Sequence, residues 1–86
     1  MSEHTFNLKV VTPDEVFFEG QAVSVIVPGE VGYFGVLSHH APLISTLGKG
    51  NLIVRDEAGK TAAYKVEGGF FEVKDNKALV LTDHIQ

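Results

Sequence analysis

The chain has 86 residues, of which 44% are apolar and none is cysteine. This length is far below the roughly 250 to 300 residues at which a single hydrophobic core divides, so we expect one small domain. Without cysteine the chain has no disulfide, no thiolate nucleophile and no Cys-based zinc site.

The net charge of −4 lies entirely in residues 1–43, because residues 44–86 carry six basic and six acidic residues. The single Arg55 and the scattered lysines form no basic stripe, so nucleic-acid binding is not expected. The N-terminus lacks the basic start and the apolar run of a secretory signal. The longest aliphatic stretches, residues 25–27 and 78–81, are far shorter than the roughly 20 residues that cross a bilayer.

Alternation of apolar and polar residues with period two runs along the chain and predicts strands with one face on a core. The residues expected on the inner face are, in chain order, Phe6, Leu8, Val10, Val23, Val25, Val27, Leu52, Val54, Ala62, Tyr64, Val66, Phe71, Val73, Leu79 and Leu81. Helical spacing is nowhere sustained. The pattern predicts an all-β protein, with about eight to ten short antiparallel strands in two packed sheets.

Turn-forming residues separate these runs. Thr12-Pro13-Asp14 is expected to end the first strand and Glu19-Gly20 the second. Residues 56–59 form a longer hairpin loop, and Asp75-Asn76 predicts a tight two-residue hairpin that tolerates positive φ. Gly68-Gly69, set between two strands, indicates a bulge or a close approach of two backbones.

Residues 29–37 form a glycine-rich segment that is unusually apolar. One interpretation tucks Phe34 and Val36 under the sandwich as a lid on its core. The other makes the segment a contact surface, with Tyr33 as its anchor because an aromatic ring with a polar tip is typical of interfaces. A phosphate-binding loop is not supported, because no helix start follows the glycines.

His39-His40 raises the alternative of a small module that binds a metal or a small ligand together with the glycine-rich segment. Adjacent residues of an extended chain point to opposite faces, and further ligands would have to come from His4, His84 or distant carboxylates. We therefore expect no metal, and interpret the pair as loop residues of which one lies at a protein contact.

Candidate catalytic residues are incomplete. Ser38, Ser45 and Thr46 lie near the two histidines in sequence, but no strand-elbow-helix pattern exposes a nucleophile. The acidic pairs Asp14-Glu15 and Asp56-Glu57 lie in expected turns, where they are typical solvated charges. We expect neither an enzyme nor a bound cofactor.

Several segments carry a family resemblance that covers essentially the whole chain. They are Leu8-Lys9-Val10-Val11-Thr12-Pro13, Pro28-Gly29-Glu30-Val31-Gly32-Tyr33-Phe34-Gly35-Val36, His40-Ala41-Pro42-Leu43, Gly50 with Leu52, and Gly68-Gly69-Phe70-Phe71-Glu72-Val73. In this order and spacing they resemble the N-terminal domain of the epsilon subunit of the F-type ATP synthase. The resemblance implies that residues 1–86 form one flattened antiparallel β-sandwich of about ten short strands.

The resemblance also implies a non-catalytic rotor subunit. Such a subunit binds the gamma subunit of the central stalk and the membrane c-ring, and it couples proton-driven rotation to ATP synthesis in the catalytic head. It is peripheral to the membrane, here at the cytoplasmic face of a bacterial inner membrane in preference to a chloroplast thylakoid. Carried over by position, the gamma-facing residues are Thr12, His40 and Ser45, and the ring-facing residues are Glu30, Gly32 and Tyr33.

The sequence departs from the family pattern in two places. Members often carry an acidic residue where this chain has Tyr33, which leaves Glu30 as the acidic residue of the ring-facing loop. The usual member also continues into a two-helix C-terminal domain that restrains ATP hydrolysis and in some members binds ATP. The sequence stops before that domain, so neither property is carried over.

Overall fold

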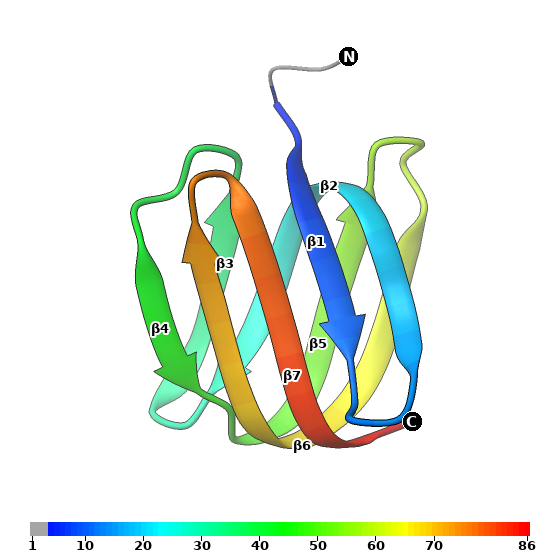
Figure 1. The fold of residues 1–86 in the computed structure, drawn as a ribbon, viewed down its shortest axis with the longest axis vertical. Helices are drawn as coiled ribbons and strands as arrows, with labels where there is room; N and C mark the ends of the chain where they lie inside the picture. The colour runs from blue at the N-terminus through cyan, green and yellow to red at the C-terminus, as the bar shows by residue number, and fades with distance from the viewer. Residues whose placement is uncertain (1–3) are drawn as a thin grey trace.

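The fold depends on two long strands that bend and contribute to two layers of sheet. A computed structural model describes residues 4–86, which contain seven β-strands and no helix (Figure 1), so none of them forms a helix that could cross a membrane. The strands are β1 (Phe6–Val11), β2 (Val16–Gly29), β3 (Gly32–Leu37), β4 (Leu43–Thr46), β5 (Lys49–Asp56), β6 (Thr61–Lys74) and β7 (Lys77–Ile85). The all-β prediction is confirmed.

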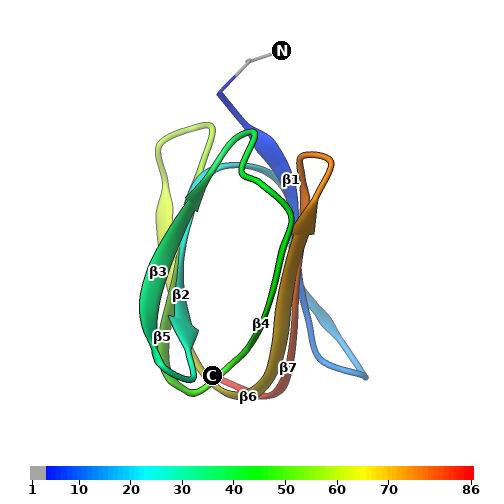
Figure 2. The ribbon, with the colours of Figure 1, turned by 90° about the vertical axis from the view of Figure 1, so that its left-hand side faces the viewer.

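The strands form two layers that face each other (Figure 2), and β2 and β6 contribute to both. The layer named here the β1 layer contains β1, β7 and β4 with residues 16–22 of β2 and 69–74 of β6. The β5 layer contains β3 and β5 with residues 24–29 of β2 and 61–67 of β6. Because β1 pairs with both β7 and β2, the ladder of hydrogen bonds closes on itself.

The prediction of about ten short antiparallel strands is wrong in number and in one pairing. Gly20 and Gly68-Gly69 were expected near strand ends, but they lie inside β2 and β6, which bend without losing their pairing. β2 and β6 have 14 residues each, and the sequence pattern divided each of them into more than one short strand. β1 and β7 are parallel, with Leu8 opposite Ala78, whereas the other paired strands are antiparallel.

Most of the predicted inner face is confirmed. The fully or nearly fully buried residues that were predicted are Phe6, Leu8, Val10, Val25, Val27, Leu52, Val54, Val66, Phe71 and Val73, whereas Ala62 and Tyr64 are half-buried. Val36 is also fully buried, and Phe34 is half-buried with its ring centroid 5.7 Å from that of Phe71 in an edge-to-face arrangement. The lid interpretation is therefore correct for both residues.

The prediction for β7 is wrong by one residue. Ala78, Val80 and Thr82 are buried, whereas Leu79 and Leu81 lie on the outer face and are half-buried. This strand is apolar on both faces, so alternation alone does not identify the inner one. Pairing decides it, because Val80 lies between Val10 and Phe71.

A similar shift affects Val23, which was expected inside. The register of β2 against β5 changes between Ala22 and Ser24, which is the mark of a β-bulge. Ala22 is fully buried there, whereas Val23 is half-buried.

The bend of β6 depends on a close approach of backbones at Gly69. Its φ is 105°, and an added Cβ would collide with the carbonyl oxygen of Leu81 and lie 2.7 Å from the Cα of Thr82. The fully buried Thr82 hydroxyl donates to the carbonyl oxygen of Gly68 at 2.8 Å and lies 3.1 Å from that of His84. The predicted close approach is confirmed.

Gly69→Ala should lower the free energy of unfolding by at least about 2 kcal/mol, because it forces a left-handed φ and a backbone collision on a residue with a Cβ. Urea unfolding measures the loss. Gly35→Ala is the matched control, since its Cβ would meet nothing within 4 Å and its φ is not left-handed. Equal effects of the two substitutions would contradict this account of the bend.

Candidate partner-binding surfaces

The predicted ring-facing residues lie on the turn between β2 and β3. Gly29 pairs with Gly32 and closes a turn whose two central residues are Glu30 and Val31. The turn lies at the end of the sandwich opposite the one where β1 begins (Figure 1). Gly32 has a φ of 150° and open space beside it, whereas an added Cβ on Gly29 would lie 2.8 Å from the carbonyl oxygen of Gly32.

Backbone and side-chain hydrogen bonds fasten this turn to the connection between β4 and β5. The amide of Glu30 donates to the carbonyl oxygen of Thr46 at 3.1 Å, and the Thr46 hydroxyl donates back to Oε1 of Glu30 at 3.1 Å. Gly48 donates its amide to the carbonyl oxygen of Pro28 at 2.9 Å, and Gly29 and Leu47 form an isolated bridge. The turn is thus tied to both layers, because β4 belongs to the β1 layer.

Tyr33 connects three strands of the β5 layer. Its hydroxyl accepts the amide hydrogen of Asn51 at 2.9 Å, so the side chain reaches from β3 across β2 to β5. The ring lies over Gly50, where an added Cβ would lie 3.0 Å from Cζ of Tyr33 and 2.9 Å from Cβ of Pro28. Tyr33 is still 57% exposed. It therefore has a structural role, and its expected contact with a partner stays a prediction.

The three predicted gamma-facing residues lie on different segments. Thr12 begins the β1–β2 turn, in which its amide donates to the carbonyl oxygen of Glu15 at 2.9 Å. His40 follows β3, with its Nδ1 2.6 Å from the carbonyl oxygen of Ala41. Ser45 lies in β4 and is half-buried. The β1–β2 turn and the β3–β4 connection lie at opposite ends of the sandwich (Figure 1), so these residues do not form one cluster.

An apolar row on the outer face of the β1 layer was missed. Leu81 lies between Val11 on β1 and Phe70 on β6, and all three side chains are half-buried. Leu79 follows on the same face, and Ile44 of β4, which is 70% exposed, lies beyond Glu72, the residue of β6 that pairs with both. The signal was present in the sequence, because residues 78–81 are apolar at every position, but Leu79 and Leu81 were predicted to face the core.

Asn76 was predicted only as a turn residue, yet it organises the end of the sandwich that carries His39. It has a φ of 60°, and the amide of His39 donates to its Oδ1 at 2.7 Å. Its Nδ2 donates to the carbonyl oxygen of Thr5 at 2.9 Å, and its own carbonyl accepts from the amide of Asn7 at 3.1 Å. The tight hairpin at Asp75-Asn76 is confirmed, since both residues have positive φ.

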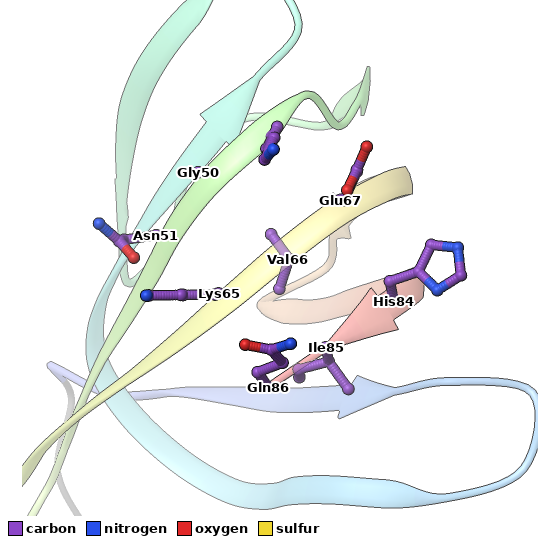
Figure 3. A pocket seen from close by; sticks show the side chains of 9 residues that line it. Gly50, Asn51, Lys65, Val66, Glu67, His84, Ile85 and Gln86 are labelled. Atoms are coloured by element: carbon purple, nitrogen blue, oxygen red, sulfur yellow. The ribbon is translucent and has the colours of Figure 1, made fainter.

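Neither a metal site nor a convergent ligand site emerges from the part of the chain that the structure describes. No group of three or more His, Cys, Asp or Glu residues there could hold a metal ion. A surface hollow lies beside the last residues of the chain, lined partly by Lys65, Glu67 and His84. Their side chains point away from one another (Figure 3), so they offer no shared point for a ligand. The expected absence of a cofactor stays a prediction.

Comparison with known proteins agrees with the β-sandwich fold. The family described as ATP synthase, delta/epsilon chain, β-sandwich domain matches residues 5–86. The ATP synthase epsilon chain of Leptospira borgpetersenii is 46% identical over 84 residues, which are 98% of this chain and 65% of that protein. The epsilon chain of Chlorobaculum tepidum is 45% identical over 86 residues, which cover 98% of this chain and 96% of that protein.

Solved structures share the fold. A chain of the Euglena gracilis mitochondrial ATP synthase, in a structure of OSCP, F1 and the c-ring, superposes with a TM-score of 0.88 at 26% identity, covering 95% of this chain and 52% of that chain. A chain from the central stalk and c-ring of the Tetrahymena thermophila mitochondrial ATP synthase superposes with a TM-score of 0.76 at 13% identity. The superposition covers 93% of this chain and 64% of that chain, and at this identity it shows the fold alone.

The chain therefore belongs to the ATP synthase delta/epsilon chain β-sandwich domain family. It spans 65% of the length of the Leptospira relative and nearly all of the Chlorobaculum one.

Tyr33→Phe should lower the free energy of unfolding by about 1 kcal/mol, because the amide of Asn51 loses its acceptor. Urea unfolding measures the change, and amide hydrogen exchange at Asn51 should become faster. Tyr64→Phe is the control, since its hydroxyl lies 3.4 Å from the carbonyl oxygen of Phe17 and should contribute less. Unchanged stability and unchanged exchange in Tyr33→Phe would refute the structural role of the hydroxyl.

Proposed function

We propose that this chain is a non-catalytic rotor subunit of an ATP synthase, and that it joins the gamma subunit of the central stalk to the c-ring. Its family and its relatives named ATP synthase epsilon chain support the proposal. So does the similar Euglena chain, which comes from a structure that contains the c-ring. In this role the chain holds no cofactor and couples ring rotation to ATP synthesis in the catalytic head.

The outer face of the β1 layer is the proposed gamma-binding surface, and its apolar row carries the proposal. A strand that is apolar on both faces is typical of a sheet covered on both sides. β7 has this character, with Leu79 and Leu81 outward and Val80 inward. Covering the outer row would remove apolar surface from water, which stabilises a complex by roughly 25 cal/mol for each Å² buried.

Two of the gamma-facing residues border this row. Thr12 follows Val11 at one end, and Phe70 pairs with Thr46, the neighbour of Ser45, at the other. The side chain of Ser45 lies on the inner side of β4, since Ser45 pairs with the buried Phe71. We therefore assign Thr12 to the rim of the gamma-binding surface and Ser45 to the sheet edge beside it. His40, in the connection that leads into β4, extends the surface at that edge.

The β2–β3 turn is the proposed ring-binding surface, formed by Glu30, Gly32 and Tyr33. It lies at one end of the sandwich, whereas the gamma-binding surface lies on a broad face. One rigid body would then meet two partners on different sides. The closed ladder supports this role, because a stiff body transmits torque with little deformation.

The proposed location follows from the partners. A domain bound to the stalk and the ring is peripheral to the membrane through the complex. Since the bacterial relatives from Leptospira borgpetersenii and Chlorobaculum tepidum are 46% and 45% identical to this chain, we place it at the cytoplasmic face of a bacterial inner membrane.

Leu81→Ser should weaken binding to purified gamma subunit by about tenfold, because it removes the centre of the apolar row. Isothermal titration of the folded variants measures the affinity, and His40→Ala tests the edge of the same surface. Leu37→Ser is the matched control, because Leu37 is 63% exposed on the outer face of the β5 layer. Weaker binding in Leu37→Ser and unchanged binding in Leu81→Ser would contradict the proposal, because they would place the gamma-binding surface on the β5 layer.

A further inference from the structure

The connection between β3 and β4 contains a residue other than glycine in the left-handed region of the backbone. His39 has a φ of 61°, a conformation that costs energy for a residue with a Cβ. Such a conformation persists only where surrounding contacts hold it, and residues held in this way are concentrated at functional sites. The next residue is His40, which the proposed function places at the edge of the gamma-binding surface.

Asn76 supplies the contact that holds His39. Its Oδ1 accepts the amide hydrogen of His39 at 2.7 Å, and its Nδ2 donates to the carbonyl oxygen of Thr5 at 2.9 Å. Its main-chain carbonyl oxygen accepts the amide hydrogen of Asn7 at 3.1 Å. Asn76 thus joins the β3–β4 connection, the β6–β7 hairpin and the start of β1, which meet at one end of the sandwich (Figure 1).

The geometry at position 76 is matched by the chemistry of asparagine. Asn76 has a φ of 60°, which glycine, asparagine and aspartate tolerate better than other residues. Glycine would fit the backbone but would bind neither His39 nor Thr5. Aspartate would accept the amide hydrogen of His39 but could not donate to Thr5. The position therefore requires a left-handed backbone, an acceptor and a donor together.

The other end of the connection is restricted by Pro42. Its ring fixes its own φ and favours extended backbone at Ala41. Between the two ends, Nδ1 of His40 lies 2.6 Å from the carbonyl oxygen of Ala41. His40 is thus held between a clamped residue and a proline. A segment that is ordered before binding loses little conformational freedom when a partner binds, which favours affinity.

We propose that Asn76 is a positioning residue for gamma binding, which holds His39 in the left-handed region and thereby presents His40 to the gamma subunit. Asn76 acts through the main chain of the β3–β4 connection and does not itself touch the partner. The inference rests on the proposed function, which supplies gamma as the partner and His40 as a contact. It extends that function to the β6–β7 hairpin.

The first test uses the free domain and three substitutions in this hairpin. Asn76→Gly tolerates the same φ and removes both side-chain bonds, whereas Asn76→Asp keeps the acceptor for His39. Asp75→Gly is the matched control, because Asp75 has a φ of 53° but makes no side-chain hydrogen bond within residues 4–86. Exchange of the His39 amide hydrogen should become at least about tenfold faster in Asn76→Gly and change by less than about twofold in the other two. Unchanged exchange in Asn76→Gly would overturn the inference.

The second test separates positioning from stability by titrating the folded variants into purified gamma subunit. Both Asn76 variants lose the bond to Thr5, so both should unfold at a lower urea concentration than the wild type. Only Asn76→Gly should weaken binding to gamma, by about fivefold, because the connection must then be ordered on binding. Asn76→Asp should change the affinity by less than about twofold, since an exposed charge contributes little. Equal losses of affinity in the two variants would reduce Asn76 to a stabilising residue and overturn the inference.

A double-mutant cycle with His40→Ala identifies the residue through which Asn76 acts. Once the His40 side chain is absent, adding Asn76→Gly should weaken gamma binding by less than about twofold further. Two losses that multiply would overturn the inference. So would wild-type affinity in Asn76→Gly together with a loss in His40→Ala, and that result would leave the proposed function standing. A wild-type chain that does not bind gamma would overturn both.

Discussion

The bend of β6 at Gly68 and Gly69 is the constraint on which the rest of the structure depends. Gly69 takes a φ of 105° against the backbone of Leu81, and a buried threonine hydroxyl, that of Thr82, fixes the adjacent carbonyl groups. The bend lets one strand pair with β5 in one layer and with β7 in the other. Without it the two layers would need separate strands, and the closed ladder would lose a shared member.

The same bend connects the two proposed binding surfaces. The residue after it, Phe70, lies in the outer apolar row, while the carbonyl oxygen of Gly69 accepts the amide of Leu47 at 2.9 Å. Leu47 bridges Gly29, which closes the ring-binding turn. A few hydrogen bonds thus join the turn to the broad face of the β1 layer. In the proposed rotor role, load from the ring would pass through this junction rather than through a flexible loop.

Sequence patterns predicted the parts of the fold that depend on local chemistry. Alternation identified the inner faces of β1 and β5, and Asp75-Asn76 predicted a hairpin because these residues tolerate positive φ. The assignment failed at β7, where Leu79 and Val80 are equally apolar and only pairing with β1 and β6 decides which faces inward. The internal roles of Tyr33 and Asn76 also escaped prediction, because their partners lie 18 and 37 or more residues away in sequence.

The orientation of the β1 layer toward a partner is the central claim, and cysteine protection tests it most directly, because the chain contains no cysteine of its own. Ile44→Cys reports on the outer face of the β1 layer and Leu37→Cys on that of the β5 layer, at similar exposures of 70% and 63%. Alkylation rates are compared in the free domain and in the assembled ATP synthase. The account predicts that assembly slows alkylation at residue 44 by at least about tenfold, since a desolvated interface excludes the reagent, and leaves residue 37 reactive. Protection of residue 37 with residue 44 still reactive would contradict it.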